Sequence, residues 1–481
     1  MLFASSALFA LAVLAEGAAA AIARNCTTNY NAGANVDYFV AQKAAAASIP
    51  SGSNVAITYP AAGNYKIVED KISNSSYVLY QCGTTMPTTN LPANLAGVFE
   101  IPVQAIITTS TTELTFLELL DARSTIMYTT DKGLITSPCI LKAALPALAD
   151  RSGTLTTDET AAWTAATAAT NLTIVGAFDT VTPSATNRDV KFPATGDQSA
   201  TLARADWLYF LAAFYNQEPL AKSLVDQITT SYNCISTAAK SSAATLGSPD
   251  AYWASGFGGV MYPGANYVKT YLASAGGTAS QVGAMDTGAA FNASYNISVA
   301  SDVTSLDTVL KNSELFFTDA VSSLDAWFGW TGLKTTDIST YNVTRAGQIW
   351  SADKQSSALG TGSGWFNGAV VNLHVVLADI ASVVQPGLFG SSYTRTYFRN
   401  IAQGEKMVTV AASQCADVNA ASTLPAITCP SAITSKSVAG VVDWTGAGEP
   451  AYQYPGGAGR TVGASLALAV MGALVASMLA I

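Results

Sequence analysis

Histidine is almost absent from the sequence, because His374 is the only one among 481 residues. A zinc site built on several histidines is therefore excluded. A Ser-His-Asp hydrolase would require His374 as its base, and the sequence contains no Gly-x-Ser-x-Gly elbow. Apolar residues surround His374 at helical spacing, which favours a partly buried helix residue. We therefore predict no catalytic residue, no metal ligand and no bound cofactor, and we do not expect an enzyme.

Charged residues are also scarce, at 11% of the chain, and their balance is acidic, with a formal net charge of −9. No cluster of lysine and arginine occurs, so a nucleic-acid partner is not expected. Solubility is instead expected to depend on small polar residues and on glycans.

Cysteine pairs of the C-x-x-C type are missing, which argues against zinc and redox motifs. An even number of six cysteines favours a few structural disulfides in an oxidising compartment. Cys415 and Cys429 are close in sequence, and we expect them to pair with each other. The partners of the other four are left open by the sequence. The predicted disulfide cysteines are Cys26, Cys82, Cys139, Cys234, Cys415 and Cys429.

Both ends of the chain carry targeting patterns. Residues 1–23 have an apolar core followed by alanines, which is typical of a secretory signal peptide cleaved near Ala20 to Ala23. Small residues from Gly456, a short spacer and an uncharged apolar tail indicate a glycolipid-attachment signal over 456–481. Attachment is expected at Gly456, with Gly446 to Gly448 as the second possible site. The alternative is a single tail-anchored span.

These patterns predict a protein on the extracellular face of the plasma membrane, delivered by the secretory pathway and held there by a glycolipid. Six N-x-S/T sequons agree with a glycosylated exterior. The predicted glycosylation sites are Asn25, Asn74, Asn171, Asn292, Asn296 and Asn342.

The mature chain is too long for one hydrophobic core, so two lobes are expected. The longest helical pattern lies between them at 217–242, with Pro219 placed for a first helical turn. We expect an N-terminal lobe at 27–216, a C-terminal lobe at 243–407, and a disulfide-closed extension and stalk at 408–455.

Short apolar strands alternate with helical patterns, which indicates an α/β fold with parallel sheets. The predicted strands are Tyr77–Gly83, Ala105–Thr109, Thr125–Thr129, Leu172–Phe178, Tyr252–Ser255, Leu315–Asp319 and Gln348–Ala352. The predicted helices, besides the bridging helix, are Thr111–Ala122, Ile140–Ala149, Leu202–Tyr215, Tyr267–Ala275, Leu306–Lys311 and Val370–Val384.

Four segments resemble the helical-backbone substrate-binding proteins of bacterial importers for siderophores, haem and cobalamin, and their secreted eukaryotic relatives. Asp121 stands where the family pattern has glycine, and Gln385 where it has histidine. The resemblance spans about 35–404 and implies two Rossmann-like lobes joined by one long helix. The matching segments are Tyr77–Thr85, Ile101–Ser124, Asp206–Glu218, and Leu377–Asp379 followed by Gln385–Phe389.

The resemblance implies that a small molecule binds between the lobes, outside the carboxyl ends of the parallel strands. The residues expected to contact it are Thr84, Thr85, Thr109, Ser110, Thr111, Ser255, Phe257, Trp327, Trp330 and Trp365.

Each of these assignments has a structural alternative. The hydroxyls from Thr109 to Thr112 can simply cap a helix, with Glu113 completing its first turn. The cluster from Trp327 to Trp330 can belong to the lobe core, although flanking glycines favour a loop. We interpret Cys82 as a disulfide partner, with Cys139 as a candidate, rather than as a ligand.

The leading functional prediction is a cell-surface receptor for an iron-siderophore-like or other ring-containing compound. The runner-up is a structural or adhesive surface glycoprotein that retains the fold without a ligand. A cell-wall hydrolase comes third and would rely on Asp319 with Asp325 or Asp353 as paired carboxylates. No transporter partner can be identified.

Overall fold

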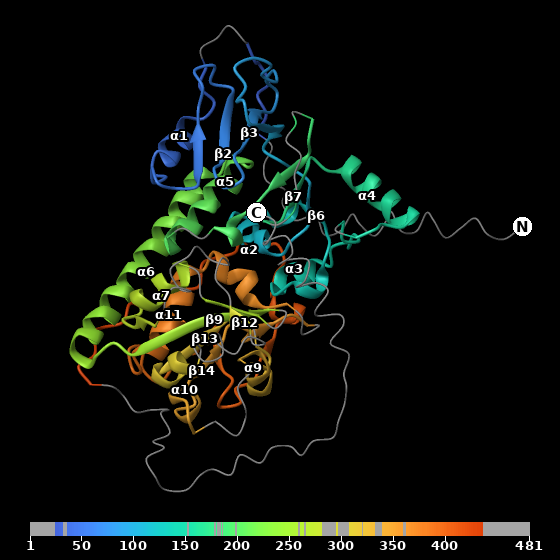
Figure 1. Cartoon of the computed structure of the whole chain (residues 1–481). Coiled ribbons are helices and arrows are strands. Elements are labelled where there is room, and N and C mark those ends of the chain that lie inside the picture. Colours follow the sequence, from blue (N-terminus) through green and yellow to red (C-terminus); the bar gives the residue numbers. More distant parts are fainter. Residues whose placement is uncertain are drawn as a thin grey trace, which may run out of the picture. The chain divides into compact units, whose positions relative to one another are not determined.

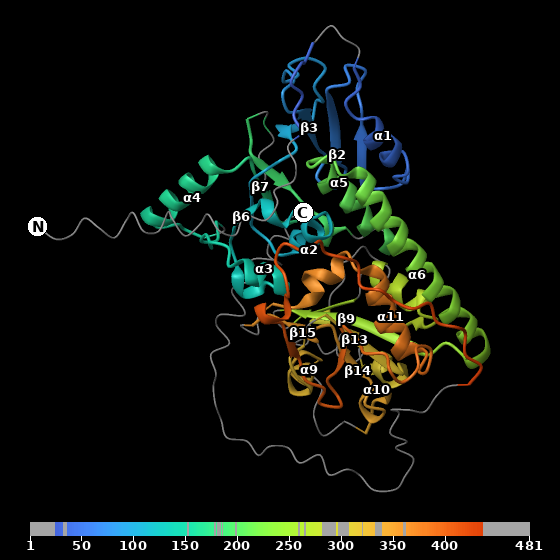
Figure 2. The same ribbon diagram turned by 180° about the vertical axis from the view of Figure 1, so that it is seen from behind.

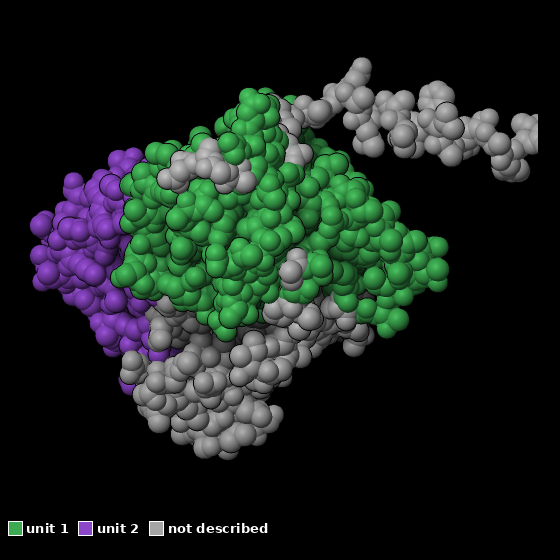
Figure 3. Space-filling view, turned by 90° about the horizontal axis from the view of Figure 1, so that it is seen from above, with its two compact units in different colours: residues 1–193, 206–225, 411–424 green, residues 194–205, 226–410, 425–481 purple. Residues whose placement is uncertain are grey.

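The computed structural model of the chain divides into two compact units, shown as ribbons in Figures 1 and 2 and coloured separately in Figure 3. Unit 1 comprises 1–193, 206–225 and 411–424, and unit 2 comprises 194–205, 226–410 and 425–481. The structure describes residues 25–31, 36–151, 153–177, 179, 184, 186–197, 200–257, 260–263, 266–280, 295–296, 307–319, 321–331, 339–358 and 362–435. Within these residues, no helix is long and apolar enough to cross a membrane.

The predicted signal peptide, Gly456 and the apolar tail lie outside the described residues. Asn292 does too. Of the other sequon asparagines, Asn25, Asn74 and Asn171 are exposed and Asn342 is half-buried. The structure places Asn296 on a strand.

Unit 1 begins with a sheet of order β1-β2-β3-β4. Its first three strands are antiparallel and only β3 and β4 are parallel. The sequence predicted parallel strands alone and recognised only β3. Strand β2, for example, carries the buried polar residues Lys66 and Asp70, which interrupt an apolar strand pattern. The elements are α1 (Val40–Ala46), β1 (Val55–Thr58), β2 (Tyr65–Asp70), β3 (Ser75–Gln81) and β4 (Leu95–Ile101).

A second sheet of unit 1, with order β6-β5-β7-β8, is parallel throughout. Helices lie between β5, β6 and β7 as predicted, and the two central strands, β5 and β7, are buried throughout, as expected for strands covered on both faces. The elements are β5 (Ile106–Thr108), α2 (Thr112–Leu119), η2 (Arg123–Thr125), β6 (Ile126–Thr129), η3 (Lys132–Leu134), α3 (Pro138–Ala143), α4 (Thr157–Ala169), β7 (Leu172–Val175) and β8 (Asp189–Lys191).

An aromatic core fills unit 1 around helix α5 (Trp207–Ala213). Trp207 and Phe210 are fully buried and contact Phe192 at ring-centroid distances of 5.7 and 6.2 Å. The predicted helix over 202–215 is wrong at its start, where the chain forms the 3₁₀ helix η5 (Thr201–Asp206) after η4 (Ala194–Gly196). The long helix α6 (Glu218–Leu246) belongs to unit 1 up to residue 225 and to unit 2 beyond it.

Unit 2 is built on a seven-stranded sheet of order β12-β10-β9-β13-β14-β16, with β11 pairing β9. The pairs β11–β9, β9–β13 and β13–β14 are parallel. The strands of this sheet are β9 (Asp250–Phe257), β10 (Val260–Pro263), β11 (Thr278–Ala279), β12 (Tyr295–Asn296), β13 (Leu315–Thr318), β14 (Ile349–Ser351) and β16 (Arg399–Asn400). The strands β15 (Gln355–Ser356) and β17 (Val408–Thr409) form a separate parallel pair. The helices are α7 (Asn266–Ser274), α9 (Leu324–Thr331), α10 (Asn342–Arg345), η8 (Gly364–Phe366), η9 (Gly368–Val370), α11 (Leu373–Val384) and η10 (Ala412–Gln414), the last of which belongs to unit 1.

The three disulfides differ from the predicted local pairing. Cys415 pairs with Cys139 and Cys429 pairs with Cys234, so the predicted Cys415–Cys429 bond is wrong. Cys82 pairs with Cys26, which excludes Cys139 as its partner. The physical reason is that the C-terminal extension packs on distant elements, first on α3 of unit 1 and then on α6 of unit 2, instead of closing on itself.

Two α/β units with parallel strands, connected through one long helix, confirm the predicted fold class.

Candidate ligand-binding edges

The turn from β5 to α2 places Thr109, Ser110 and Thr111 beyond the carboxyl end of a parallel strand, as predicted. The hydroxyl of Ser110 accepts a hydrogen bond from the Thr112 amide at 3.1 Å, and the Ser110 amide donates to Oε1 of Glu113 at 3.1 Å. These are local hydrogen bonds of the turn that precedes α2, whose N-cap residue Thr111 makes no side-chain capping bond. The Ser110 and Thr112 amides, which could otherwise bind an anionic group, are therefore occupied by the chain's own side chains.

Thr109 instead faces the loop that follows β7. Its hydroxyl donates to Oδ2 of Asp179 at 2.9 Å, and the Gly176 amide donates to the same oxygen at 2.9 Å. A Cβ on Gly176 would lie 3.1 Å from Cβ of Ser110, so any larger residue would have to displace Ser110 by a few tenths of an ångström. Asp179 is exposed. The sequence did not identify Asp179 as a candidate site residue, because no recognisable motif surrounds it after the strand.

Glu113 lies beneath this turn and is completely buried. Its Oε2 has no hydrogen-bond partner. Burial raises the pKa of Glu113 to about 8, hydrogen bonds from its own and the Ser110 backbone partly oppose the shift, and the charge of Asp179 adds to it. The carboxyl is therefore largely protonated at neutral pH. Sequence reasoning identified Glu113 only as a capping residue.

Thr84 and Thr85 follow β3 and therefore lie beyond the first sheet of unit 1, not the parallel sheet that holds Thr109. The Thr84 hydroxyl donates to the Gln81 carbonyl at 2.6 Å, and the Asn64 side chain donates to the Thr85 carbonyl at 3.0 Å. The predicted group of threonines is thus divided between two sheets.

The tryptophans of unit 2 correct the prediction of an aromatic wall. Trp327 is 1% exposed and lies in helix α9, where its ring packs on Phe316 at 5.3 Å. It belongs to the hydrophobic core and is not available to a ligand, and the predicted loop is a helix because Gly329 fits within a regular turn. Trp330 lies on the same helix, and Ser255 and Phe257 lie on β9; the side chains of these three are outside the description.

Trp365 is also buried and packs on Trp253 and Phe398 at 5.5 and 5.7 Å. The indole N–H of Trp253 donates to Oδ1 of Asp319 at 3.0 Å. Asp319 is half-buried and directly follows β13, so this edge combines a carboxylate with indole rings. Near it, burial raises the pKa of Tyr267 to about 12, with the Arg204 guanidinium opposing and the Asp319 charge adding to the shift.

Two of the groups that the sequence assigned to a hydrolase have other partners. Asp353 is buried against Arg399, with two contacts of 2.6 Å, so it does not pair with Asp319 as a catalytic carboxylate. His374 is buried in α11, and its Nε2 contacts the Pro425 carbonyl at 2.9 Å, which confirms a buried helix histidine. Within the described residues, no three histidine, cysteine or acidic side chains are grouped to hold a metal.

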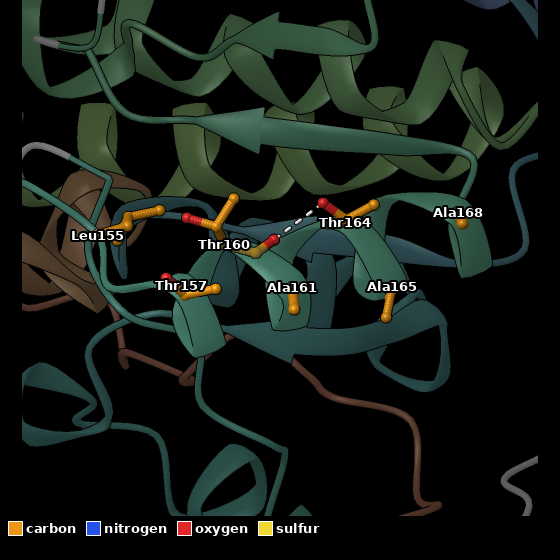
Figure 4. Close-up of a pocket in the computed structure, with 7 residues that line it drawn as sticks. All are labelled: Leu155, Thr157, Thr160, Ala161, Thr164, Ala165 and Ala168. Atoms are coloured by element: carbon orange, nitrogen blue, oxygen red, sulfur yellow. Dashed lines mark hydrogen bonds between the residues drawn. The ribbon is translucent and has the colours of Figure 1, made fainter.

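A hollow lies along one face of α4 and not at a strand edge (Figure 4). Small side chains line it, and the Thr164 hydroxyl donates to the Thr160 carbonyl at 2.9 Å. A second shallow hollow lies beside the Cys234–Cys429 disulfide. Neither contains a charged side chain or a predicted binding residue.

No protein-family model matches the chain, and a comparison with curated proteins finds no match. Among solved structures, the chain is similar to a periplasmic heme-binding protein from Pseudomonas aeruginosa, with 12% identity, a TM-score of 0.40, and coverage of 61% of this chain and 99% of that one. It is also similar to the periplasmic heme-binding protein RhuT from Roseiflexus sp. RS-1, at 13% identity and a TM-score of 0.36, covering 58% and 98%. An Fe3+-hydroxamate transport protein from Saccharomonospora viridis shows 15% identity and a TM-score of 0.35, covering 52% and 84%. Values this low assign neither a family nor a ligand to this chain.

Proposed function

We propose that the protein is a solute-binding protein held at the outer face of the plasma membrane by a C-terminal glycolipid. It captures a small ring-containing molecule, such as an iron-siderophore-like compound, and performs no catalysis. The observation that carries the proposal is the carboxyl edge of the parallel sheet in unit 1, where three loops meet around Thr109, Gly176 and Asp179. In open α/β sheets, ligands bind outside this edge.

The edge is organised for contact with a ligand. The Thr130 hydroxyl donates to the Thr109 carbonyl at 2.9 Å, so the loop after β6 is tied to the loop after β5. The Gly176 amide lies 3.3 Å from the Thr109 hydroxyl and ties in the loop after β7. Asp179 remains exposed at the surface of this framework. Loops that are held in place by hydrogen bonds and that expose polar groups are typical of a preorganised binding surface.

The second candidate is a structural or adhesive surface glycoprotein without a ligand. It is favoured by the hydrogen bonds that engage Ser110 within the turn before α2, and by the burial of Trp327 and Trp365 in the core of unit 2. Both features remove groups that the sequence assigned to ligand contact.

Purification of the secreted protein from its native host, followed by mass spectrometry of released small molecules, tests the proposal. We expect one stoichiometric compound. The variant Gly176→Val should lose it, because the new side chain would displace Ser110, whereas Gly153→Val is a matched control with open space around its Cβ. Recovery of no compound from the wild-type protein would favour the ligand-free glycoprotein.

A further inference from the structure

We propose that the outer edge of strand β17 is a docking site for an extended acidic segment of a partner protein, which binds by adding a strand to the β15–β17 pair. This docking site belongs to unit 2, and it is independent of the solute site proposed in unit 1. Three features of the described chain carry the proposal: the direction of the Thr409 backbone, the exposed apolar side chains of the strand, and the charge beside it.

Strand β17 has one side of its backbone bonded and the other side open. On the bonded side, the Val408 amide donates to the Lys354 carbonyl at 2.6 Å. The Val410 amide donates to the Ser356 carbonyl at 2.8 Å. Because alternate residues of a strand direct their backbone groups to opposite sides, the N–H and C=O of Thr409 point away from β15. Both residues of β17 are exposed, so these groups form a template for a further strand.

The neighbouring strand β15 cannot offer the same template. Its Ser356 forms an antiparallel bridge with Ser363 on the side away from β17. Within the part of the chain that the structure describes, β15 and β17 form a sheet of two strands only. A sheet of two strands is only marginally stable, so a third strand would stabilise it. The outer side of β17 is therefore where a partner strand can add.

The strand also exposes apolar side chains. Met407 is 41% exposed and Val408 is 47% exposed. Gln355 is the register partner of Val408, and it faces η8, because a Cβ on Gly364 would lie 2.7 Å from its Oε1. Since residues paired across two strands share a face of the sheet, Val408 lies on the face that η8 borders. A partner strand with apolar side chains at alternate positions would cover Val408 on this face.

Basic side chains accompany this edge. Glu405 is held by two cations, with Nζ of Lys354 at 2.8 Å from Oε1 and Nη2 of Arg395 at 3.3 Å from Oε2. Lys406 follows Glu405 in the chain and is exposed. Among the described residues beside β17, three cations thus accompany one carboxylate. This local positive charge contrasts with the formal net charge of −9 for the whole chain.

The positive charge determines which partner fits. Asp353 and Arg399 also lie near this edge, but they bond each other at 2.6 Å and their charges cancel. A second copy of the chain would bring like charges together, and a lysine at a strand edge is a common device against such self-pairing. An acidic strand is attracted by the same charges, while main-chain hydrogen bonds supply affinity. The partner is therefore an extended segment in which acidic and apolar residues alternate.

Fluorescence polarisation of labelled pentapeptides with the intact secreted protein tests this docking site. The probe is Glu-Val-Thr-Val-Glu, blocked at both ends. One counterpart is Lys-Val-Thr-Val-Lys, and the other is the acidic peptide with a methyl group on every backbone nitrogen. We expect the probe to bind at least about tenfold more tightly than either counterpart, because the first lacks charge complementarity and the second lacks main-chain donors.

Thr409→Pro removes the outward amide and leaves the bonded amides of Val408 and Val410 in place. Proline is tolerated where the N–H of an edge strand faces solvent, so the fold should persist. We expect about tenfold weaker binding of the probe, whereas the control Thr409→Ala retains the amide and should bind as the wild type does. Lys406→Gln should weaken binding about threefold. Thermal unfolding verifies the fold of each variant, and the methylated peptide decides if Thr409→Pro is unstable.

Equal binding of the methylated peptide, unchanged binding by a folded Thr409→Pro variant, or no binding of the probe overturns the proposal. Vesicles of anionic lipid provide the remaining comparison. If the protein binds them and does not bind the probe, the basic edge faces a membrane and the proposal is wrong. None of these outcomes bears on the recovery of a bound solute, so failure here leaves the proposed function standing.

Discussion

Asp379 is fully buried in α11 and shows how single side chains stabilise unit 2. It accepts hydrogen bonds from the Thr396, Tyr397 and Phe398 amides at 2.6 to 3.2 Å, and from the Tyr393 hydroxyl at 2.7 Å. One carboxylate therefore fixes the segment that leads into β16.

Replacement of Asp379 by alanine should lower the free energy of unfolding by about 3 kcal/mol, because several buried donors would lose their acceptor. Chemical denaturation monitored by tryptophan fluorescence measures this change. The control Ser382→Ala removes one half-buried hydroxyl of the same helix and should cost less than about 1 kcal/mol. Equal losses in the two variants would contradict this role of Asp379.

The raised pKa of Glu113 leads us to expect that the stability of the protein depends on pH. Its pKa is raised by burial to about 8, from 4.5, so the folded protein retains a proton that the unfolded chain releases. Stability is therefore lost as pH rises from about 4.5 to 8, by up to about 1.4 kcal/mol per pH unit. Glu113→Gln should remove this slope, and unfolding curves at several pH values test it. Asp158→Asn, at an exposed site on α4, should follow the wild-type curve, and parallel curves for Glu113→Gln and wild type would refute the prediction.

At the scale of elements, the C-terminal extension is attached to unit 1 by both covalent and polar contacts. Lys142 of α3 donates to the Cys415 and Ala416 carbonyls at 2.8 Å, next to the Cys139–Cys415 disulfide. The Arg123 guanidinium donates to carbonyls further along the extension and is itself held by Glu118 at 3.1 Å.

Arg123→Lys should release residues 417–424 while the disulfide retains Cys415, because an ammonium group cannot reproduce the planar set of donors. Hydrogen–deuterium exchange of this peptide should rise at least about tenfold, the factor expected when about 1.4 kcal/mol of local stability is lost. Arg188→Lys, which alters an arginine that caps α4 carbonyls, should leave the exchange unchanged. Unchanged exchange in Arg123→Lys would show that the disulfide alone fixes the extension.

At the scale of the whole molecule, two disulfides connect distant parts of the sequence, with separations of 276 and 195 residues. Long closed loops restrict the unfolded chain strongly. The double variant Cys139→Ser and Cys415→Ser should therefore lose about 2–4 kcal/mol of stability, measured by thermal unfolding. The Cys26–Cys82 disulfide closes a loop of only 56 residues, so the double variant Cys26→Ser and Cys82→Ser should lose less stability. A larger loss in this second variant would contradict the chain-entropy argument.

The proposed glycolipid anchor is tested on intact cells. Phosphatidylinositol-specific phospholipase C should release the protein, and a variant that replaces Gly456 to Ala458 with glutamines should lose surface attachment, because attachment requires small residues. Changing Gly446 and Gly448 to glutamine serves as the control for the second possible site. Surface retention in both variants would favour a tail-anchored span.

Local sequence patterns predicted those strands and helices in which apolar residues recur at a regular spacing along the whole element. Strands β5, β7 and β13 and helices α6, α7 and α11 were predicted close to their observed bounds, because apolar side chains must alternate or recur wherever an element is buried. The burial of His374 followed from the same pattern.

The tertiary structure decided what depends on residues far apart in the sequence. The partners of Cys415 and Cys429, the burial of Trp327, and the positions of Asp179 and Asp319 beside neutral donors result from packing between distant segments. Sequence spacing carries no information about such contacts, because pairing depends on where the folded backbone brings two residues. The sequence therefore determined the α/β class and its principal helices, whereas only the folded chain determined the covalent connectivity and the charge at the candidate edges.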